Sequence, residues 1–539
     1  MATDILQARV TAATAIAAVA ALMAGCTVGP DFHRPDDAPP PAWEALPAAD
    51  AASAPSRVVA APFDGRQWWA VFHDPVLDAL VDEAVAQNLD LQATALRIAE
   101  ARAQRGATAS QARPSVSGMG LAGRERMSEN GIASSLGGGA AAAGGASSSP
   151  APAAAPAPVS NLFQVGFDAT WELDLWGKTR RAVEAADAAI RSAEQARGEA
   201  AVSLTAEVAR TYLHLRATQR QRAIAWQDVA DQHRLLALTD SRSRNGFASQ
   251  ADSVRQATEL AAAEARLPPL DDELHRTESQ LTRLLALPPG ALHARLAVAG
   301  AATLPDRGAH GTAAGQADAS GSLTAAGAAD TDTRLPPEVP VGLPGELLRR
   351  RPDVLRAEAD LHAATARIGV ARAQLYPSIT LGAFAGLQAT HAADLTDWSS
   401  RFWAGGAQVS LPLFQGGRLK AQVRIADAQA QEAALAWRGT VLTAYHEADD
   451  AIATYALAQA HARALAAQRA QAARSRDLMQ SRRQAGFVSE IEVIDAQRQL
   501  HQADVALSQA TSEAAIGLVA LFKALGGDWQ DERATAATP

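Results

Sequence analysis

The chain has 539 residues, of which 48% are hydrophobic, 20% charged and only 5% aromatic. This composition is ordinary for an ordered protein, but the shortage of aromatic residues favours alanine-rich helices over an aromatic-packed β-sandwich. The net charge is −9, and basic residues alternate with acidic ones along the chain instead of forming a basic stripe. We therefore expect no nucleic-acid partner.

The N-terminus has the features of an export signal. Arg9 precedes an apolar stretch over residues 10–23, which is too short to span a bilayer as a helix but suits a signal-peptide core. The stretch ends in small residues directly before Cys26, the only cysteine of the chain, so a disulfide framework is excluded. We expect residues 1–25 to be a lipoprotein signal peptide.

Cys26 is the candidate lipidation site. A lone cysteine after small residues at a signal cleavage site resembles the bacterial lipobox, in which the thiol is diacylated and the cysteine becomes the new N-terminus. The alternative, a buried structural cysteine, would have to lie inside a signal peptide. Two acyl chains anchor a protein stably. Because Thr27 follows instead of Asp, which resembles sorting to the outer membrane, we expect anchoring in outer-membrane lipid.

The second half of the chain repeats the first. A shift of 240 residues places Gly177 on Gly417, Asp187 on Asp427, Glu207 on Glu447, Ser241-Arg242 on Ser481-Arg482, Gly246-Phe247 on Gly486-Phe487, and Ser249 on Ser489. A shift of 263 residues places Pro114-Ser115 on Pro377-Ser378. Self-similarity of this kind indicates a duplicated structural unit.

Two low-complexity tracts interrupt the repeat. Residues 130–158 consist almost entirely of Gly, Ala, Ser and Pro, and they account for the 23-residue difference between the two shifts. Such a segment cannot bury enough apolar surface to order itself, so we expect a long mobile loop over residues 127–160. A second tract, over residues 300–335, is expected to link the halves.

Each half has the same predicted plan. A helix of about 35 residues leads through Pro114 or Pro377 into short strands, and a very long helix, a tight turn and a long return helix follow. The long helix over residues 178–244 has apolar residues at spacings of three and four, typical of a coiled-coil seam. It would measure roughly 100 Å. Pro268-Pro269 predicts a break in the first return helix.

Alternating residues predict strands with one apolar and one polar face. Every second residue from Phe163 to Leu173 is apolar, and the run from Trp403 to Leu411 repeats the pattern less cleanly. A single such strand could belong to a sandwich with one solvated face. However, each half offers only two strands, and four strands cannot close a barrel. Several chains would therefore have to pool their strands into a membrane barrel with a polar lumen.

A set of short motifs spans the chain from Cys26 to Trp529. They are Cys26-Thr27-Val28-Gly29-Pro30-Asp31-Phe32, Trp68-Trp69 followed by Phe72-His73-Asp74-Pro75, Asn88-Leu89-Asp90-Leu91, Arg350-Arg351-Pro352-Asp353, Tyr376-Pro377-Ser378, and Leu413-Phe414-Gln415-Gly416-Gly417. Together they make the chain similar to the TolC/OprM-like outer-membrane factors of multidrug efflux and secretion systems, specifically the lipidated, NodT-like efflux branch. Any one of these motifs alone would be weak evidence for the resemblance.

The resemblance implies a mainly α fold with membrane β-strands. Each chain would have two duplicated halves, giving four strands and long coiled-coil helical hairpins, and would assemble as a trimer with a 12-stranded β-barrel and an α-helical periplasmic tunnel. It also implies the outer-membrane channel of a tripartite efflux system, a passive exit duct for small molecules. The partners would be a periplasmic adaptor (membrane fusion protein) and an inner-membrane transporter. No cofactor is expected.

The repeat and the resemblance together divide the chain into segments. After the signal peptide we expect a lipid-anchored N-terminal extension over residues 26–76. The first repeat would cover residues 77–299, with residues 127–160 as an extracellular loop. Residues 300–335 would form an equatorial linker, residues 336–530 the second repeat, and residues 531–539 a C-terminal tail.

The two turns between the long helices are the first candidate site. Each carries a glycine suited to a left-handed turn and a serine suited to a helix N-cap. Capping alone would explain these residues. The resemblance implies, compatibly, that the turns are periplasmic tips that dock the adaptor through Gly246, Phe247 and Ser249 in the first turn and Gly486, Phe487 and Ser489 in the second.

Acidic residues just inside the tips are the second candidate site. Asp252 corresponds to Glu492, and Asp495 lies one turn later on the same face. A solvated helix face is the alternative interpretation. The resemblance implies that these acids line a constricted periplasmic gate, where like charges from three copies repel one another and favour cations. Arg483 is a candidate for an ion pair or hydrogen bond that keeps the gate closed.

Three other functions remain to be weighed. A periplasmic coiled-coil adaptor lipoprotein would show one helical hairpin within a small β-domain, not two duplicated hairpins. An enzyme would need a reactive constellation, and the sequence has no metal-spaced Cys or His pair, phosphate loop or Gly-x-Ser-x-Gly motif. The outer-membrane duct of a protein secretion system would share the fold. The lipid site favours efflux.

Overall fold

The computed structural model describes residues 27–36, 39–46, 56–62, 65, 67–126, 159–297 and 335–527. Cys26 and most of the two low-complexity tracts lie outside the described residues. The chain divides into two compact units. We call them the strand unit, built from residues 1–33, 100–190 and 360–434, and the hairpin unit, built from residues 34–99, 191–359 and 435–539.

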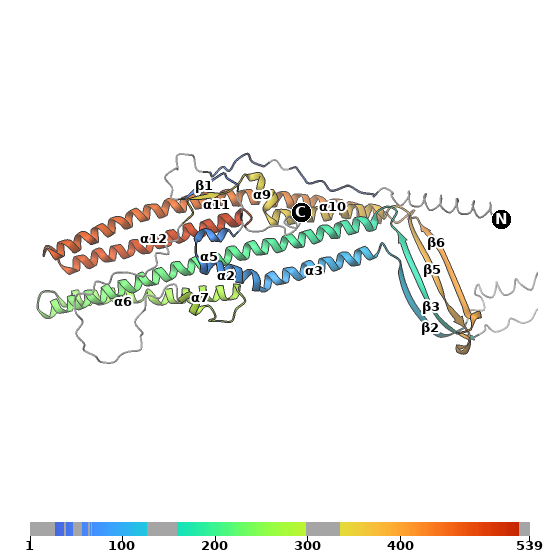
Figure 1. The fold of residues 1–539 in the computed structure, drawn as a ribbon, viewed down its shortest axis with the longest axis horizontal. Helices are drawn as coiled ribbons and strands as arrows, with labels where there is room; N and C mark the ends of the chain where they lie inside the picture. Colours follow the sequence, from blue (N-terminus) through green and yellow to red (C-terminus); the bar gives the residue numbers. More distant parts are fainter. Residues whose placement is uncertain are drawn as a thin grey trace, which may run out of the picture. The chain divides into compact units, whose positions relative to one another are not determined.

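The strand unit contains one antiparallel sheet of four strands, in the order β2-β3-β5-β6 (Figure 1). The strands are β2 (Ser115–Arg126), β3 (Val159–Leu173), β5 (Ser378–Ala389) and β6 (Arg401–Ser410), with the short 3-10 helices η3 (Ala392–Asp394) and η4 (Trp398–Ser400) before β6. Each half of the chain supplies two strands, as predicted. In the described part of the chain, β2 and β6 are edges with no further strand beside them.

One face of this sheet is apolar across all four strands. The register pairs Phe167 with Gly118 and Ala385, and Ala385 with Trp403, so these side chains point to the same side. In the single chain this face is open, with Phe167 65% and Trp403 83% exposed. The predicted alternation is confirmed. The apolar face consists mainly of Val116, Gly118, Gly120, Ala122, Phe163, Val165, Phe167, Ala169, Trp171, Leu173, Ile379, Leu381, Ala383, Ala385, Leu387, Trp403, Gly405, Ala407 and Val409.

Equal element lengths confirm the duplication. Helices α5 (Lys178–Arg244) and α11 (Arg418–Gln484) both have 67 residues, and their bounds differ by 240 positions. Helices α3 (Leu89–Ser110) and α10 (Pro352–Ala373) both have 22 residues and differ by 263 positions. The predicted bounds of the first long helix are also confirmed. All four helices have residues in both units.

The prediction of a single helix of about 35 residues before each pair of strands is wrong, because two helices take its place in each half. In the first half α2 (Pro75–Gln87) ends at Asn88, whose side chain accepts a backbone N–H of α3 at 3.0 Å and so starts a new helix. In the second half α9 (Pro344–Arg350) ends at Arg351. The ring of Pro352 disfavours the helical conformation at this preceding residue.

The two return helices differ at the prolines. The first consists of α6 (Gln250–Glu264) and α7 (Leu267–Leu284), and Pro268 lies in the first turn of α7, where its missing N–H costs no helical bond. The predicted break is therefore confirmed. The second is the unbroken α12 (Glu490–Ala524). By length and composition α12 could cross a membrane, but half of its apolar window is buried inside the chain.

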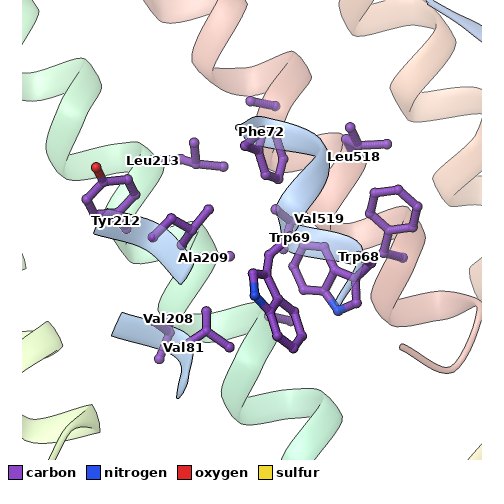
Figure 2. Close-up of a cluster of buried hydrophobic side chains, with 14 of the residues drawn as sticks. Trp68, Trp69, Phe72, Val81, Val208, Ala209, Tyr212, Leu213, Leu518 and Val519 are labelled. Atoms are coloured by element: carbon purple, nitrogen blue, oxygen red, sulfur yellow. The ribbon is translucent and has the colours of Figure 1, made fainter. Parts of the chain in front are cut away.

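The core of the hairpin unit surrounds the rings of η2 (Trp68–Phe72). Figure 2 shows these rings between side chains of α5, such as Leu213, and side chains of α12, such as Leu518. The centroids of the Trp68 and Phe522 rings are 5.3 Å apart. Nearby, β1 (Arg57–Val59) pairs in parallel with β4 (Glu338–Pro340), and α8 (His293–Ala297) contributes the buried Leu296. This core joins the N-terminal extension to both repeats.

Arg351 joins three parts of the hairpin unit at the break before α10. It is only 7% exposed, and its guanidinium donates to Asp353 at 2.7 Å, to Glu447 of α11 at 2.6 Å and to the carbonyl of Ala524 at 2.9 Å. Burial alone would lower the pKa of Arg351, but the hydrogen bonds and charges of both carboxylates outweigh it and raise the pKa. The residue therefore stays charged while it caps the end of α12.

We predict that Arg351→Ala destabilises the protein by about 2 kcal/mol, because it removes a buried guanidinium and leaves the carbonyl of the buried Ala524 and the half-buried Asp353 without their donor. Thermal unfolding followed by circular dichroism should show a midpoint several degrees below that of the wild type. Arg349→Ala is the matched control, since Arg349 lies two residues earlier and is exposed. Equal midpoints for the two variants would contradict the prediction.

Candidate functional site at the hairpin tips

Both turns between long helices have the predicted backbone geometry. Gly246 and Gly486 adopt φ of 76° and 79°, in the left-handed region that favours glycine. The N–H of Phe247 donates to the carbonyl of Arg242 at 2.8 Å, and the N–H of Phe487 makes the same bond to Arg482 at 2.9 Å. These bonds close the Schellman motif at each helix end. The two tips are therefore structural copies of one another.

Each tip then starts its return helix with a serine cap. The Ser249 hydroxyl accepts the N–H of Asp252 at 3.2 Å, while the Asp252 carboxylate accepts the N–H of Ser249 at 3.1 Å. In the second tip the Glu492 carboxylate accepts the N–H of Ser489 at 3.3 Å. The hydrogen bonds from Ser249 lower the pKa of Asp252. Capping is thus a role of both acids, in addition to the two interpretations weighed from the sequence.

The structure also brings the candidate acids together around one cleft of about 1010 Å³ between the two hairpins. Asp252 reaches it from α6, and Glu492 and Asp495 reach it from α12. Phe247 and Phe487 lie at its rim and are each 76% exposed. A pair of open aromatic rings at the tips is a surface suited to contact with another protein.

Arginines line the same cleft, and sequence reasoning missed them. Asp495 pairs with Arg498 at 2.6 Å, and Asp252 lies 3.9 Å from Arg255. The lining contains four acids and four arginines, namely Asp252, Glu259, Glu492 and Asp495 with Arg242, Arg255, Arg482 and Arg498. The repeat carried the missing signal, because Arg242 and Arg482 stand 240 positions apart. The cleft lining of one chain therefore carries equal numbers of acidic and basic side chains.

Arg483 lies outside the cleft lining. Its guanidinium pairs with Glu490 at 2.5 Å, so it joins the end of α11 to the start of α12 within one tip. Among the described residues, no group of three or more His, Cys, Asp and Glu side chains is placed to hold a metal ion. The chemistry that this site offers is thus charge pairing and contact, through side chains carried by two stiff helical hairpins.

Comparison with known proteins places the chain among efflux proteins. The sequence pattern of the family described as outer membrane efflux protein matches residues 80–287 and 343–527. The chain is 30% identical to the probable efflux pump outer membrane protein TtgC of Pseudomonas putida, over 97% of this chain and 96% of that one. It is 28% identical to the pyoverdine export outer membrane protein OpmQ of Pseudomonas aeruginosa, over 87% and 89%.

A solved structure agrees with the sequence matches. The outer-membrane channel OprN is 30% identical to this chain and superimposes with a TM-score of 0.73, which covers 93% of this chain and 99% of that one. At this coverage the likeness extends over both units and not over one of them alone. The fold described above is therefore that of an outer-membrane channel protein.

We predict that Ser249→Ala frays the first turn of α6, because an N-cap serine contributes about 1 kcal/mol. Hydrogen exchange at residues 250–254 should become faster, while Ser249→Thr, which keeps the hydroxyl, should stay near the wild type. Since the pKa of Asp252 is lowered in the folded tip, its stabilisation is present at neutral pH and is lost as pH falls through that lowered pKa. Unchanged exchange in Ser249→Ala would show that the cap is dispensable.

Proposed function

The chain belongs to the outer membrane efflux protein family, and we propose that it forms the passive exit duct of its efflux system. As a member of the family it is an outer-membrane channel component that extends into the periplasm. The observation that carries the proposal is the sheet whose four strands share one apolar face. A lipid-embedded barrel around an aqueous lumen needs an apolar outer face and a polar inner one.

The open edges of this sheet support an assembly of several chains, and we propose the homotrimer that the family resemblance implies. One chain ends in the edges β2 and β6, and their outward N–H and C=O groups would meet hydrocarbon unpaired. Pairing β6 of one chain with β2 of the next removes every edge. Three chains of four strands each give a 12-stranded barrel. The long hairpins of the same three chains would then form the α-helical tunnel through the periplasm.

The N-terminal segment supports the proposal that Cys26 is lipidated. Cys26 lies outside the described residues, but the next residue, Thr27, lies against Gly177, where an added Cβ would be 2.8 Å from the Thr27 methyl carbon. Asp31 pairs with the buried Arg181 of α5 at 2.6 Å. Thr27, the residue after Cys26, is therefore next to the segment that joins β3 to α5. This position is consistent with an acyl chain that enters lipid beside the proposed barrel.

We also propose the segment boundaries expected from the sequence. The parallel pairing of β1 with β4 supports an equatorial belt, because β1 lies in the extension over residues 26–76 and β4 directly follows the linker over residues 300–335. The repeats over residues 77–299 and 336–530 would supply the strands and hairpins. Residues 127–160 would be extracellular, and residues 531–539 would be a tail.

The tips are the proposed docking site for a periplasmic adaptor. An inner-membrane transporter would be the second partner and would drive small molecules into the duct. Gly246, Phe247 and Ser249, with Gly486, Phe487 and Ser489, form two exposed copies of one turn. For the gate we propose that Asp252, Glu492 and Asp495 set the charge of the periplasmic mouth together with the arginines of the cleft. Arg483 would keep the mouth closed by stiffening its tip through Glu490.

The outer-membrane duct of a protein secretion system is the second candidate, because it would share the fold. The match to an efflux pump protein over 97% of the chain favours efflux. A coiled-coil adaptor is disfavoured by the four-stranded sheet with its open apolar face. We infer no catalytic activity, since the family consists of channels.

We predict that the detergent-solubilised protein is a trimer, because other chains must pair the edges β2 and β6 and the 12-stranded barrel implied by the resemblance needs three chains of four strands. Native mass spectrometry should give three chain masses, and planar bilayers should show discrete conducting events. The lipidated mature form is the sample to use, with the Cys26→Ser variant as a control for the anchor. A folded monomer that conducts would contradict the proposed assembly.

For the gate, we predict that Glu492→Gln combined with Asp495→Asn lowers cation preference in planar bilayers. Both amides keep their size, and Gln still accepts a capping hydrogen bond, so the change removes charge with little effect on the cap. Arg498 would lose its carboxylate partner, which adds to the shift toward anions. Arg255→Gln, which removes a positive charge, should raise the cation preference. Arg483→Ala should raise the resting conductance, because it removes the ion pair that stiffens the tip.

The control for the gate is Asp477→Asn, because Asp477 is acidic and exposed but does not line the cleft. The effect of the double variant should weaken at high salt, since screening removes the field of exposed charges over about 10 Å at 0.1 M. Unchanged selectivity of the double variant at low salt would return the three acids to the role of helix caps and a solvated face.

A further inference from the structure

The duplication of the chain preserves the register of the strands as well as their lengths. Strands β2 and β5 both have 12 residues, and their bounds differ by 263 positions. In the pair β2–β3, Ser115 lies opposite Thr170. Shifts of 263 and 240 positions turn these residues into Ser378 and Ser410, which lie opposite one another in the pair β5–β6. The two shifts therefore relate one strand pair to the other residue by residue.

The same shifts apply to the pairing of β3 with β5, which joins the two halves within one chain. In this pair Leu173 lies opposite Ile379. The equivalent of β3 is β6 and the equivalent of β5 is β2, but β6 and β2 lie at opposite edges of the sheet. β6 can therefore make the equivalent pairing only with β2 of another chain. The shifts then place Leu413 opposite Val116 of that chain.

The residues after β6 lack the partner that their equivalents in β3 have. Pairing of β3 with β2 ends at Thr170, but β3 continues over residues 171–173 because β5 pairs with them. Strand β6 ends at Ser410, where its pairing with β5 ends. In the described part of the chain, Leu411 and Leu413 have no strand beside them, and they are 52% and 87% exposed. A further strand at this edge would order these residues.

The backbone groups of this edge suit such a partner. Gly166 lies opposite Gly386, and an added Cβ on Gly166 would be only 3.0 Å from the Cα of Gly386. So narrow a pair is a non-hydrogen-bonded one, and the neighbouring residues of β3 exchange hydrogen bonds with β5. By the same alternation Leu411 and Leu413 direct their N–H groups to the open edge. Pro412, between them, has its nitrogen on the opposite side, so its missing N–H costs no bond at this edge.

We propose that β6 of one chain pairs with β2 of the next chain in this register, with Leu413 opposite Val116 and Trp403 opposite Arg126. Residues 411–413 then extend β6 in the way that β5 extends β3. The apolar faces of the two chains are continuous across this seam, because Val116 and Trp403 both lie on the apolar face of their sheet. The inference rests on the proposed assembly of several chains and adds the register of their contact.

Oxidative cross-linking of a cysteine pair tests the register. Ser410 and Met119 of the next chain would form a non-hydrogen-bonded pair, whose Cα atoms lie about 4.5 Å apart, within reach of a disulfide. Within one chain β3 and β5 separate the two residues, so no internal disulfide can form. The detergent-solubilised variant with Ser410→Cys and Met119→Cys should give a covalent trimer in non-reducing electrophoresis after oxidation. Reduction should return it to monomers.

Two matched controls combine Ser410→Cys with Ser117→Cys or with Leu121→Cys. Each moves the partner cysteine by two residues on the same face, which separates the sulfur atoms by about 7 Å more and prevents a disulfide. Ser410→Cys alone excludes cross-links through Cys26. Native mass spectrometry before oxidation keeps the two proposals apart. A trimer that cross-links only in a shifted pair, or in none, would overturn the register but not the assembly, whereas a monomer would overturn both.

Hydrogen exchange of the wild-type protein gives a measurement that needs no variant. In the assembled protein the amides of Leu411 and Leu413 should exchange slowly, like those of their equivalents Trp171 and Leu173, which already pair with β5. Dissociation into monomers by a harsher detergent should make the exchange of Leu411 and Leu413 fast and leave that of Trp171 and Leu173 slow. Fast exchange of Leu411 and Leu413 in the trimer would show that β6 ends at Ser410, against the proposal.

Discussion

The pairing of backbone groups at the sheet edges is the constraint on which the rest of the structure depends. Four strands with one apolar face are too few to close on themselves, and open edges are not tolerated in hydrocarbon. In the proposed assembly, closure comes from other copies of the chain. There the long helices that leave the sheet would be placed around a common axis, and the hairpins would become the wall of a conduit instead of an isolated coiled coil.

Much of this architecture could be predicted from the sequence because the periodic patterns are long. The bounds of α5, the glycine turns and the break at Pro268 followed from helix periodicity and proline chemistry. The breaks at Asn88 and Arg351 were missed, because each depends on a local conformation within a helical pattern that otherwise continues. The register that extends the apolar face over all four strands also could not be read from single strands.

The gate predicted at the candidate acids stays a prediction, but the single chain shows their surroundings. The acids inside the tips line one cleft, and two of them also cap their helices. Two of the arginines in the cleft stand three residues after an acid on the same helix, so sequence spacing could have shown them. Arg242 and Arg482 come from the preceding helices, and tertiary packing brings them to the cleft. Sequence spacing on a single helix shows which residues share a face, but it does not show which charges arrive from the helix packed opposite.

The duplication has a consequence for the stoichiometry of assembly at the tips. The turns themselves match, glycine for glycine and phenylalanine for phenylalanine, so a ring of three chains would offer six backbone copies of one motif. About two helical turns further along each return helix, the corresponding side chains have opposite charges, because Arg255 stands where the second hairpin carries Asp495. Six identical partner molecules around this rim would therefore meet alternating charge and could not all make the same contacts. Either the partner tolerates both surfaces, or it binds in threes and selects one.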